Sequence, residues 1–160
     1  MQGTDRIHFG SLQPILFSAV IVMHKVVLVI LIILNLISFF TLRQPESFLE
    51  LKKRYLSFID VLPEEFKMLR TRSILTGTST KGELGYNTNK GYEIAICLDD
   101  DVNSMFHVLL HELAHCTVSE YEHSDKFWAN FEKLKNIAVA NDLYVPIQAE
   151  TPFCGKKIKD

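Results

Sequence analysis

Residues 102–128 read VNSMFHVLLHELAHCTVSEYEHSDKFW, and the interpretation of the whole chain depends on this stretch. Its first half repeats apolar residues at helical spacing, which predicts a helix. These residues are Phe106, Leu109, Leu110 and Leu113. His111 and His115 stand four residues apart in the same stretch. A helix would therefore present both imidazoles on one face, about one turn apart.

The five residues 111–115 spell H-E-x-x-H, a spacing that lets two imidazoles bind one metal ion. Glu112 can then reach a water molecule at the metal without binding the ion itself. His123 follows His115 by eight residues, enough for the helix to end and the chain to return a third nitrogen. Three protein ligands and one open position are typical of catalytic zinc, whereas structural zinc is usually closed by four ligands. The simpler alternative is two histidines on an ordinary amphipathic helix.

These motifs resemble those of the WLM metallopeptidases and the related SprT family. In those families H-E-L-x-H is followed by a third histidine in an H-x-x-x-F context, as in His123 to Phe127 here. Residues 84–98, LGYNTNKGYEIAICL, also resemble the WLM hairpin that precedes the metal helix. More loosely, residues 143–155 are similar to the tails of small predicted metallopeptidases of large DNA viruses.

The resemblance implies a small zincin-like α+β domain, with helices around a short antiparallel hairpin or sheet. It also implies that His111, His115 and His123 bind Zn²⁺ and that Glu112 is catalytic. Two features depart from the family. The spacer of seven residues, 116–122, is longer than usual, and the chain is slightly acidic although the family's best-known role is cutting proteins crosslinked to DNA.

Hydrolysis of peptide bonds in a protein substrate is the expected reaction, with Glu112 as general base toward a water that zinc polarises. Tyr121 is a nearby candidate for stabilising the oxyanion, although a loop role is the simpler interpretation. The alternative function is a catalytically inactive zinc-binding scaffold or interaction domain tethered to a membrane. A small membrane protein without metal is a third possibility.

Residues 26–42 form an uncharged run, VVLVILIILNLISFFTL, between Lys25 and Arg43. This length is just sufficient for a transmembrane helix, and we prefer an uncleaved anchor to a signal peptide because no small-x-small cleavage site follows. Residues 1–25 are then a short extension, and Met23 is an alternative start. Basic residues after the run outnumber those before it, which favours the cytosolic side for the metallopeptidase domain, residues 43–160.

Composition indicates one folded domain, since 48% of the 160 residues are hydrophobic and 22% are charged. Only Asp5, Arg6 and Lys25 among the charged residues precede residue 43, so residues 43–160 carry 15 basic and 18 acidic residues. This excess of acidic residues disfavours nucleic acid as a partner. The sequence does not indicate an oligomeric state. Cys97, Cys116 and Cys154 are irregularly spaced and odd in number, so we expect reduced thiols.

The remaining pattern predicts an amphipathic helix over 46–62, a short helix over 63–70, strands or a hairpin over 73–98, and a last helix over 125–141. Residues 156–159 are interpreted as part of a mobile tail. His107 lies one turn before His111 but about 12 Å from His115 along the helix, too far to share its metal ion. We expect His107 on the helix surface or behind the metal ligands, Cys116 as a small buried residue, and Phe127 and Trp128 as packing for His123.

Overall fold

The computed structural model describes residues 13–41, 43–80 and 82–160. By its internal contacts the chain divides into two compact units, Met1–Arg43 and Gln44–Asp160. Among the described residues, the first unit contains one helix, and the second contains the H-E-x-x-H motif and His123. The two units are described separately below.

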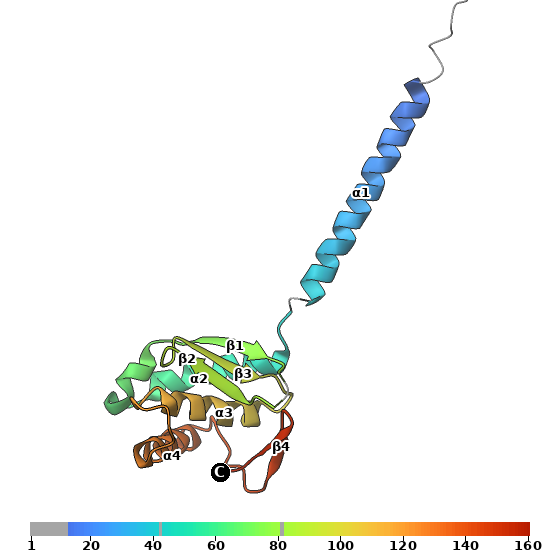
Figure 1. The fold of residues 1–160 in the computed structure, drawn as a ribbon. Coiled ribbons are helices and arrows are strands. Elements are labelled where there is room, and N and C mark those ends of the chain that lie inside the picture. The colour runs from blue at the N-terminus through green and yellow to red at the C-terminus, as the bar shows by residue number, and fades with distance from the viewer. Residues whose placement is uncertain (1–12, 42, 81) are drawn as a thin grey trace, which may run out of the picture. The chain divides into compact units, whose positions relative to one another are not determined.

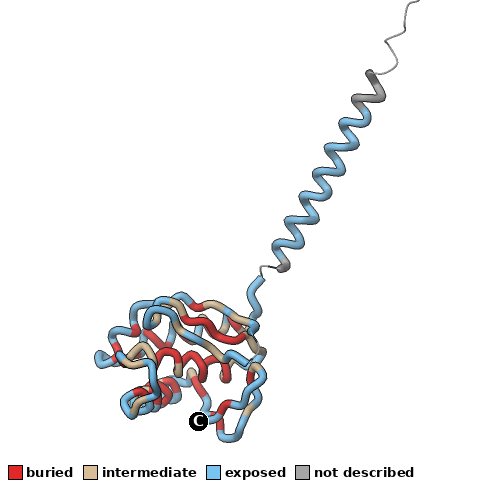
Figure 2. The backbone as a smooth tube through the Cα atoms, in the orientation of Figure 1, coloured by how far each residue is buried: buried red, intermediate tan, exposed pale blue. Residues whose placement is uncertain are grey.

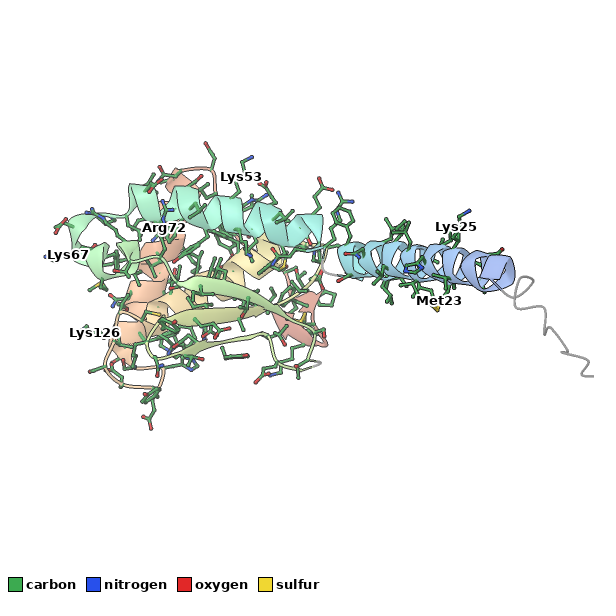
Figure 3. The ribbon with its side chains drawn as sticks, turned by 90° about the horizontal axis from the view of Figure 1, so that it is seen from above. Met23, Lys25, Lys53, Lys67, Arg72 and Lys126 are labelled. Atoms are coloured by element: carbon green, nitrogen blue, oxygen red, sulfur yellow. A yellow bond between two sulfur atoms is a disulfide. The ribbon has the colours of Figure 1, made fainter. Side chains whose placement is uncertain are left out.

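Helix α1, Gln13–Thr41, makes up nearly all of the described part of the first unit. Within it, Ser18–Phe39 is long and apolar enough to cross a membrane by length and composition, with a mean hydropathy of 2.8. The helix begins earlier than the predicted residue 26, because Met23 and Lys25 are themselves helical (Figure 3). Of the predicted extension, residues 1–25, the part from residue 13 onward is therefore helical, while residues 1–12 lie outside the described part.

The second unit is an α+β domain, which confirms the predicted fold class (Figure 1). Helices occur close to the predicted positions, although the short second one is a 3₁₀ helix. The helices are α2 (Glu46–Val61), η1 (Glu64–Arg70), α3 (Val102–His115) and α4 (Asp125–Ala140). The strands are β1 (Ile74–Thr78), β2 (Gly85–Thr88), β3 (Glu93–Cys97), β4 (Thr151–Phe153) and β5 (Lys156–Ile158).

The larger sheet has the strand order β1-β3-β2. Strands β2 and β3 form the predicted antiparallel hairpin, with Asn87 opposite Ile94. Strand β1 pairs with the other side of β3 in parallel, with Leu75 opposite Ile94. The sheet is therefore mixed rather than purely antiparallel. The hairpin already occupies one side of β3, so β1 pairs along the opposite side and leaves β3, the most buried strand, in the centre.

Helix α3 is the centre of the domain and the most continuously buried helix (Figure 2). It packs against β2 and β3, and also against α2 and α4. Asp101 caps its N-terminus, because the Asp101 carboxylate accepts a hydrogen bond from the backbone N–H of Asn103. Most of the surface of α3 packs inside the protein, which fixes the direction in which its histidines point.

The predicted mobile tail is wrong, since residues 151–158 form the hairpin β4–β5. Cys154 and Gly155 make its two-residue turn with φ values of 47° and 82°, the left-handed region that such turns require. The expectation of reduced thiols is also wrong for two of the cysteines, because Cys97 and Cys154 form a disulfide across 57 residues. Cys116 is free. The spacing of the cysteines along the chain does not predict this pairing, because only the folded chain brings the end of β3 next to the turn between β4 and β5.

We expect the C97S/C154S double variant to lose about 2–4 kcal/mol of unfolding free energy, because a cross-link over this span restricts the unfolded chain. Urea unfolding of the wild-type and variant chains measures the difference. The C116S variant, which leaves the disulfide intact, is the matched control and should change the midpoint less. Equal midpoints for oxidised and reduced wild-type chains would contradict the disulfide.

Candidate metal centre

Three histidine side chains converge where α3 ends and α4 begins. The Nε2 atom of His123 lies 3.1 Å from Nε2 of His111 and 3.1 Å from Nε2 of His115. Donor atoms around a tetrahedral zinc ion stand about 3.3 Å apart, given Zn–N bonds of about 2.0–2.1 Å. The two distances from His123 thus match the spacing around a small metal ion, and the three ligand atoms, one from each residue, all lie within 4.8 Å of one another.

The loop that carries His123 is held in place at several points. The Lys90 ammonium donates hydrogen bonds to the backbone carbonyls of Val118 and Glu120, at 3.2 and 3.0 Å. The Asn130 side-chain amide on α4 donates to the Thr117 hydroxyl at 2.8 Å. These bonds fix the seven-residue spacer 116–122. The longer spacer is therefore compatible with His123 as the third member of the cluster.

Two aromatic residues of α4 contact the histidines. The Phe127 ring is fully buried and its centroid lies 5.0, 4.4 and 4.6 Å from those of His111, His115 and His123. The indole of Trp128 lies 5.3 Å from the His123 ring, and 47% of this residue is exposed. Ser124 begins α4 by accepting a hydrogen bond from the backbone N–H of Phe127. Phe127 thus forms an apolar support for the cluster, as the sequence indicated.

The electrostatic environment favours neutral imidazoles. Burial, together with the neighbouring His115 and His123, lowers the pKa of His111 to about 4. Burial also lowers the pKa of His115, helped by His123 and Lys90. A metal ion binds the neutral ring, so these shifts keep the ligand atoms available in mildly acidic solution.

Glu112 lies next to the cluster and is 7% exposed. Its Oε2 accepts a hydrogen bond from the side-chain amide of Asn87 on β2, at 3.0 Å. Burial raises the pKa of Glu112, and the Asn87 bond offsets part of this increase. A raised pKa makes the carboxylate a stronger proton acceptor. Asn87 was not a predicted site residue, because only the pairing of β2 with β3 brings it to α3.

A cavity of about 610 Å³ lies beside His111 and Glu112. Its lining combines α3 with the segment before β2 and with strand β5. The lining residues are Thr80, Gly82, Glu83, Leu84, Gly85, His107, Val108, His111, Glu112, Lys156 and Ile158. The tail that the sequence predicted to be mobile therefore supplies one wall of the cavity, and a peptide side chain would fit inside.

Three other residues considered in the sequence analysis are not members of the three-histidine cluster. His107 is only 7% exposed, so its expected surface position is wrong, and it contacts Tyr144 instead. The Cys116 thiol is partly buried and donates to the backbone carbonyl of Glu112; burial raises its pKa to about 11, which keeps it protonated. Tyr121 is 85% exposed, and its ring packs on the Lys90 ammonium at 4.2 Å. A loop role for Tyr121 agrees with this position.

The α+β domain brings three histidines together beside a buried glutamate, and α3 carries two of these histidines and the glutamate. This arrangement defines a candidate metal-dependent hydrolase. Residues 64–150, more than half of the chain, match the family model of the WLM domain. The chain belongs to the WLM domain family, as the motifs around His111 and His123 indicated.

Two known proteins are similar to parts of the chain. The uncharacterized protein R325 of Acanthamoeba polyphaga mimivirus is 33% identical over 85 residues, which cover 47% of this chain and 43% of that protein. The chain therefore matches less than half the length of this relative. The crystal structure of the metallopeptidase zymogen of Pyrococcus abyssi abylysin is 21% identical, with a TM-score of 0.39 over 59% of this chain and 85% of that one.

The metal-free protein should lose stability as the pH falls from about 6.5 to about 4. In this window the unfolded chain binds a proton at His111, whose ordinary pKa is 6.5, while the folded chain binds it only near pKa 4. Since the unfolded state binds more protons, lower pH favours unfolding. Urea midpoints in EDTA at pH 7, 6 and 5 should decrease in that order, and the H111N variant should show a weaker dependence. A constant wild-type midpoint would refute the expectation.

Proposed function

We propose that this protein is a zinc-dependent metallopeptidase that hydrolyses peptide bonds in protein substrates. The observation that carries the proposal is the convergence of three histidines, with Nε2 of His123 3.1 Å from Nε2 of both His111 and His115, beside a buried glutamate and an adjacent cavity. In this proposal His111, His115 and His123 hold the zinc. Three nitrogen ligands leave a coordination position open, which a catalytic zinc site requires.

The proposed mechanism assigns a separate task to each group. Bound zinc would act as a Lewis acid and would lower the pKa of a water molecule toward neutrality. Glu112 takes the proton from the attacking water and later gives it to the leaving amine. Asn87 holds Oε2 of this carboxylate, while Oε1 has no partner among the described residues. Because no described buried oxygen lacks a partner, Oε1 must be accessible from the cavity, where it can exchange a proton.

The E112Q variant should retain about one zinc per chain and lose cleavage of a denatured protein such as casein by roughly a hundredfold or more. Glutamine preserves the size of the side chain but cannot take up the proton. Elemental analysis and the cleavage assay on the full chain measure the two effects. The H123A variant is the companion and should lose zinc as well as activity.

Either variant can contradict the proposal. Full activity of E112Q would exclude Glu112 as the base. Unchanged zinc content in H123A would exclude the three-histidine site. If the wild-type chain bound zinc but cleaved no protein, the alternative function of an inactive zinc-binding scaffold would replace the peptidase.

We further propose that helix α1 anchors the domain to a membrane through Ser18–Phe39. Two indications of the side of the membrane disagree. Arg43, Lys52, Lys53 and Arg54 after the span favour the cytosolic side. The Cys97–Cys154 disulfide favours an oxidising compartment. We give the disulfide more weight, because Lys52, Lys53 and Arg54 belong to α2, a folded helix from which Lys53 projects outward (Figure 3).

Protease treatment of intact microsomes containing the full chain should therefore leave a C-terminal tag undigested. Detergent should make the same tag sensitive, because the membrane alone protects it. A matched chain in which Arg43 and Lys52–Arg54 are replaced by Gln tests the effect of the basic residues. Digestion of the wild-type tag in intact vesicles, together with reduced Cys97, would restore the cytosolic assignment.

A further inference from the structure

His107 is a buried histidine outside the metal cluster that nevertheless borders the cavity. It lies one turn before His111 on α3 and lines the cavity together with His111 and Glu112. Its Nδ1 lies 2.8 Å from the Tyr144 hydroxyl and 3.5 Å from the Asp160 carboxylate. Tyr144 follows α4 and Asp160 follows β5, so three segments far apart in sequence meet at this ring.

The ionised Asp160 carboxylate determines which groups donate and which accept in the hydrogen bonds around Tyr144. Asp160 is ionised: burial alone would raise its pKa, but hydrogen bonds from Lys135, Tyr144 and the backbone of Ile147 lower it below the usual value. The Lys135 ammonium lies 2.8 Å from Asp160 Oδ1. A carboxylate can only accept, so the Tyr144 hydroxyl donates its single proton to Asp160 Oδ2, at 2.7 Å.

This direction determines which nitrogen of His107 carries the proton. The Tyr144 oxygen has given its proton to Asp160 and can only accept from His107. Nδ1 of His107 must therefore be the protonated nitrogen. A neutral imidazole has one N–H group, so Nε2 of His107 is left with a free lone pair.

The free nitrogen is accessible from the cavity. Nε2 of His107 has no hydrogen-bond partner among the described residues. No buried side-chain nitrogen or oxygen in the described part of the chain lacks a partner. Nε2 therefore retains accessible surface, and His107 lines the cavity beside Glu112. The lone pair is available to a donor that enters this cavity.

We propose that His107 binds the substrate by accepting, at Nε2, a hydrogen bond from a main-chain N–H of the peptide. Tyr144 and Asp160 are positioning residues that keep the required nitrogen unprotonated. This inference rests on the proposed peptidase function. A main-chain N–H is a donor that nearly every residue of a peptide offers, whereas a peptide carbonyl cannot bond to a bare nitrogen. His107 would thus bind peptides without selecting a particular side chain.

The tautomer can be measured without any activity assay. The full chain in detergent micelles, loaded with zinc and labelled with ¹⁵N-histidine, is suited to long-range ¹H–¹⁵N NMR. We expect the neutral His107 ring to carry its proton on Nδ1. The NMR signals of His107 are assigned as those that disappear in the H107Q variant. The Y144F variant keeps the ring but removes the accepting oxygen, so the Nδ1–H form should lose its dominance. Protonation of His107 at Nε2 in the wild-type chain would overturn the proposal.

Cleavage of denatured casein tests the effect on the substrate. Removing one neutral hydrogen bond should lower kcat/KM of H107L roughly 3- to 10-fold, through KM more than kcat, with unchanged zinc content. H107Q places an amide oxygen near Nε2 and should recover most of the loss. K157A is the matched control: Lys157 is on the same hairpin as Lys156, is well exposed and pairs with Glu150, so its removal should have no effect.

The outcomes separate the two proposals. Wild-type cleavage that H107L retains in full would overturn the role of His107 and leave the peptidase proposal intact. A zinc-loaded wild-type chain that cleaves no casein would overturn both. Loss of zinc in Y144F and in H107Q, which preserve the ring or its acceptor, would identify a purely structural role and also overturn the inference.

Discussion

The rest of the structure depends on the fixed rotation of helix α3. Its apolar side packs into the core through residues such as Leu109, Leu110 and Leu113, all nearly fully buried. Any rotation about the helix axis would expose these side chains to water, at about 25 cal/mol for each Å² of apolar surface. The opposite side, with His111 and His115, is thereby held against α4. The hydrophobic core is thus what keeps the two imidazoles aligned.

The features that the sequence predicted are those encoded within a few helical turns. Once a helix forms, the four-residue spacing of His111 and His115 places both imidazoles on one face. The ends of α3 and α4 follow from local residues such as Asp101 and Ser124, which cap them. His123 lies beyond the helix, so periodicity alone could not place it. Its spacing from His115 allowed a third ligand there, the resemblance to WLM proteins implied that role, and the structure brings His123 to the other two histidines.

The missed features all depend on contacts between distant segments. Asn87 reaches Glu112 only through the register of β2 on β3, and β1 pairs in parallel along the side of β3 that the hairpin leaves open. Cys97 meets Cys154 only when the last hairpin lies beside the end of β3. No local pattern encodes such pairings. The surroundings of the candidate metal centre, unlike its three histidines, therefore could not be predicted from the sequence alone.

The Cys97–Cys154 bond closes a covalent ring that contains the whole candidate metal centre. His111 and His115 lie before the exposed Tyr121, and His123 lies after it, all within this ring. A single break in the backbone at Tyr121 would open the loop without separating the two pieces. The ligands on both sides of such a nick would remain part of one molecule. If this protein meets proteases, or cleaves its own copies, the disulfide would thereby hold its three histidines in one molecule after a cut at Tyr121.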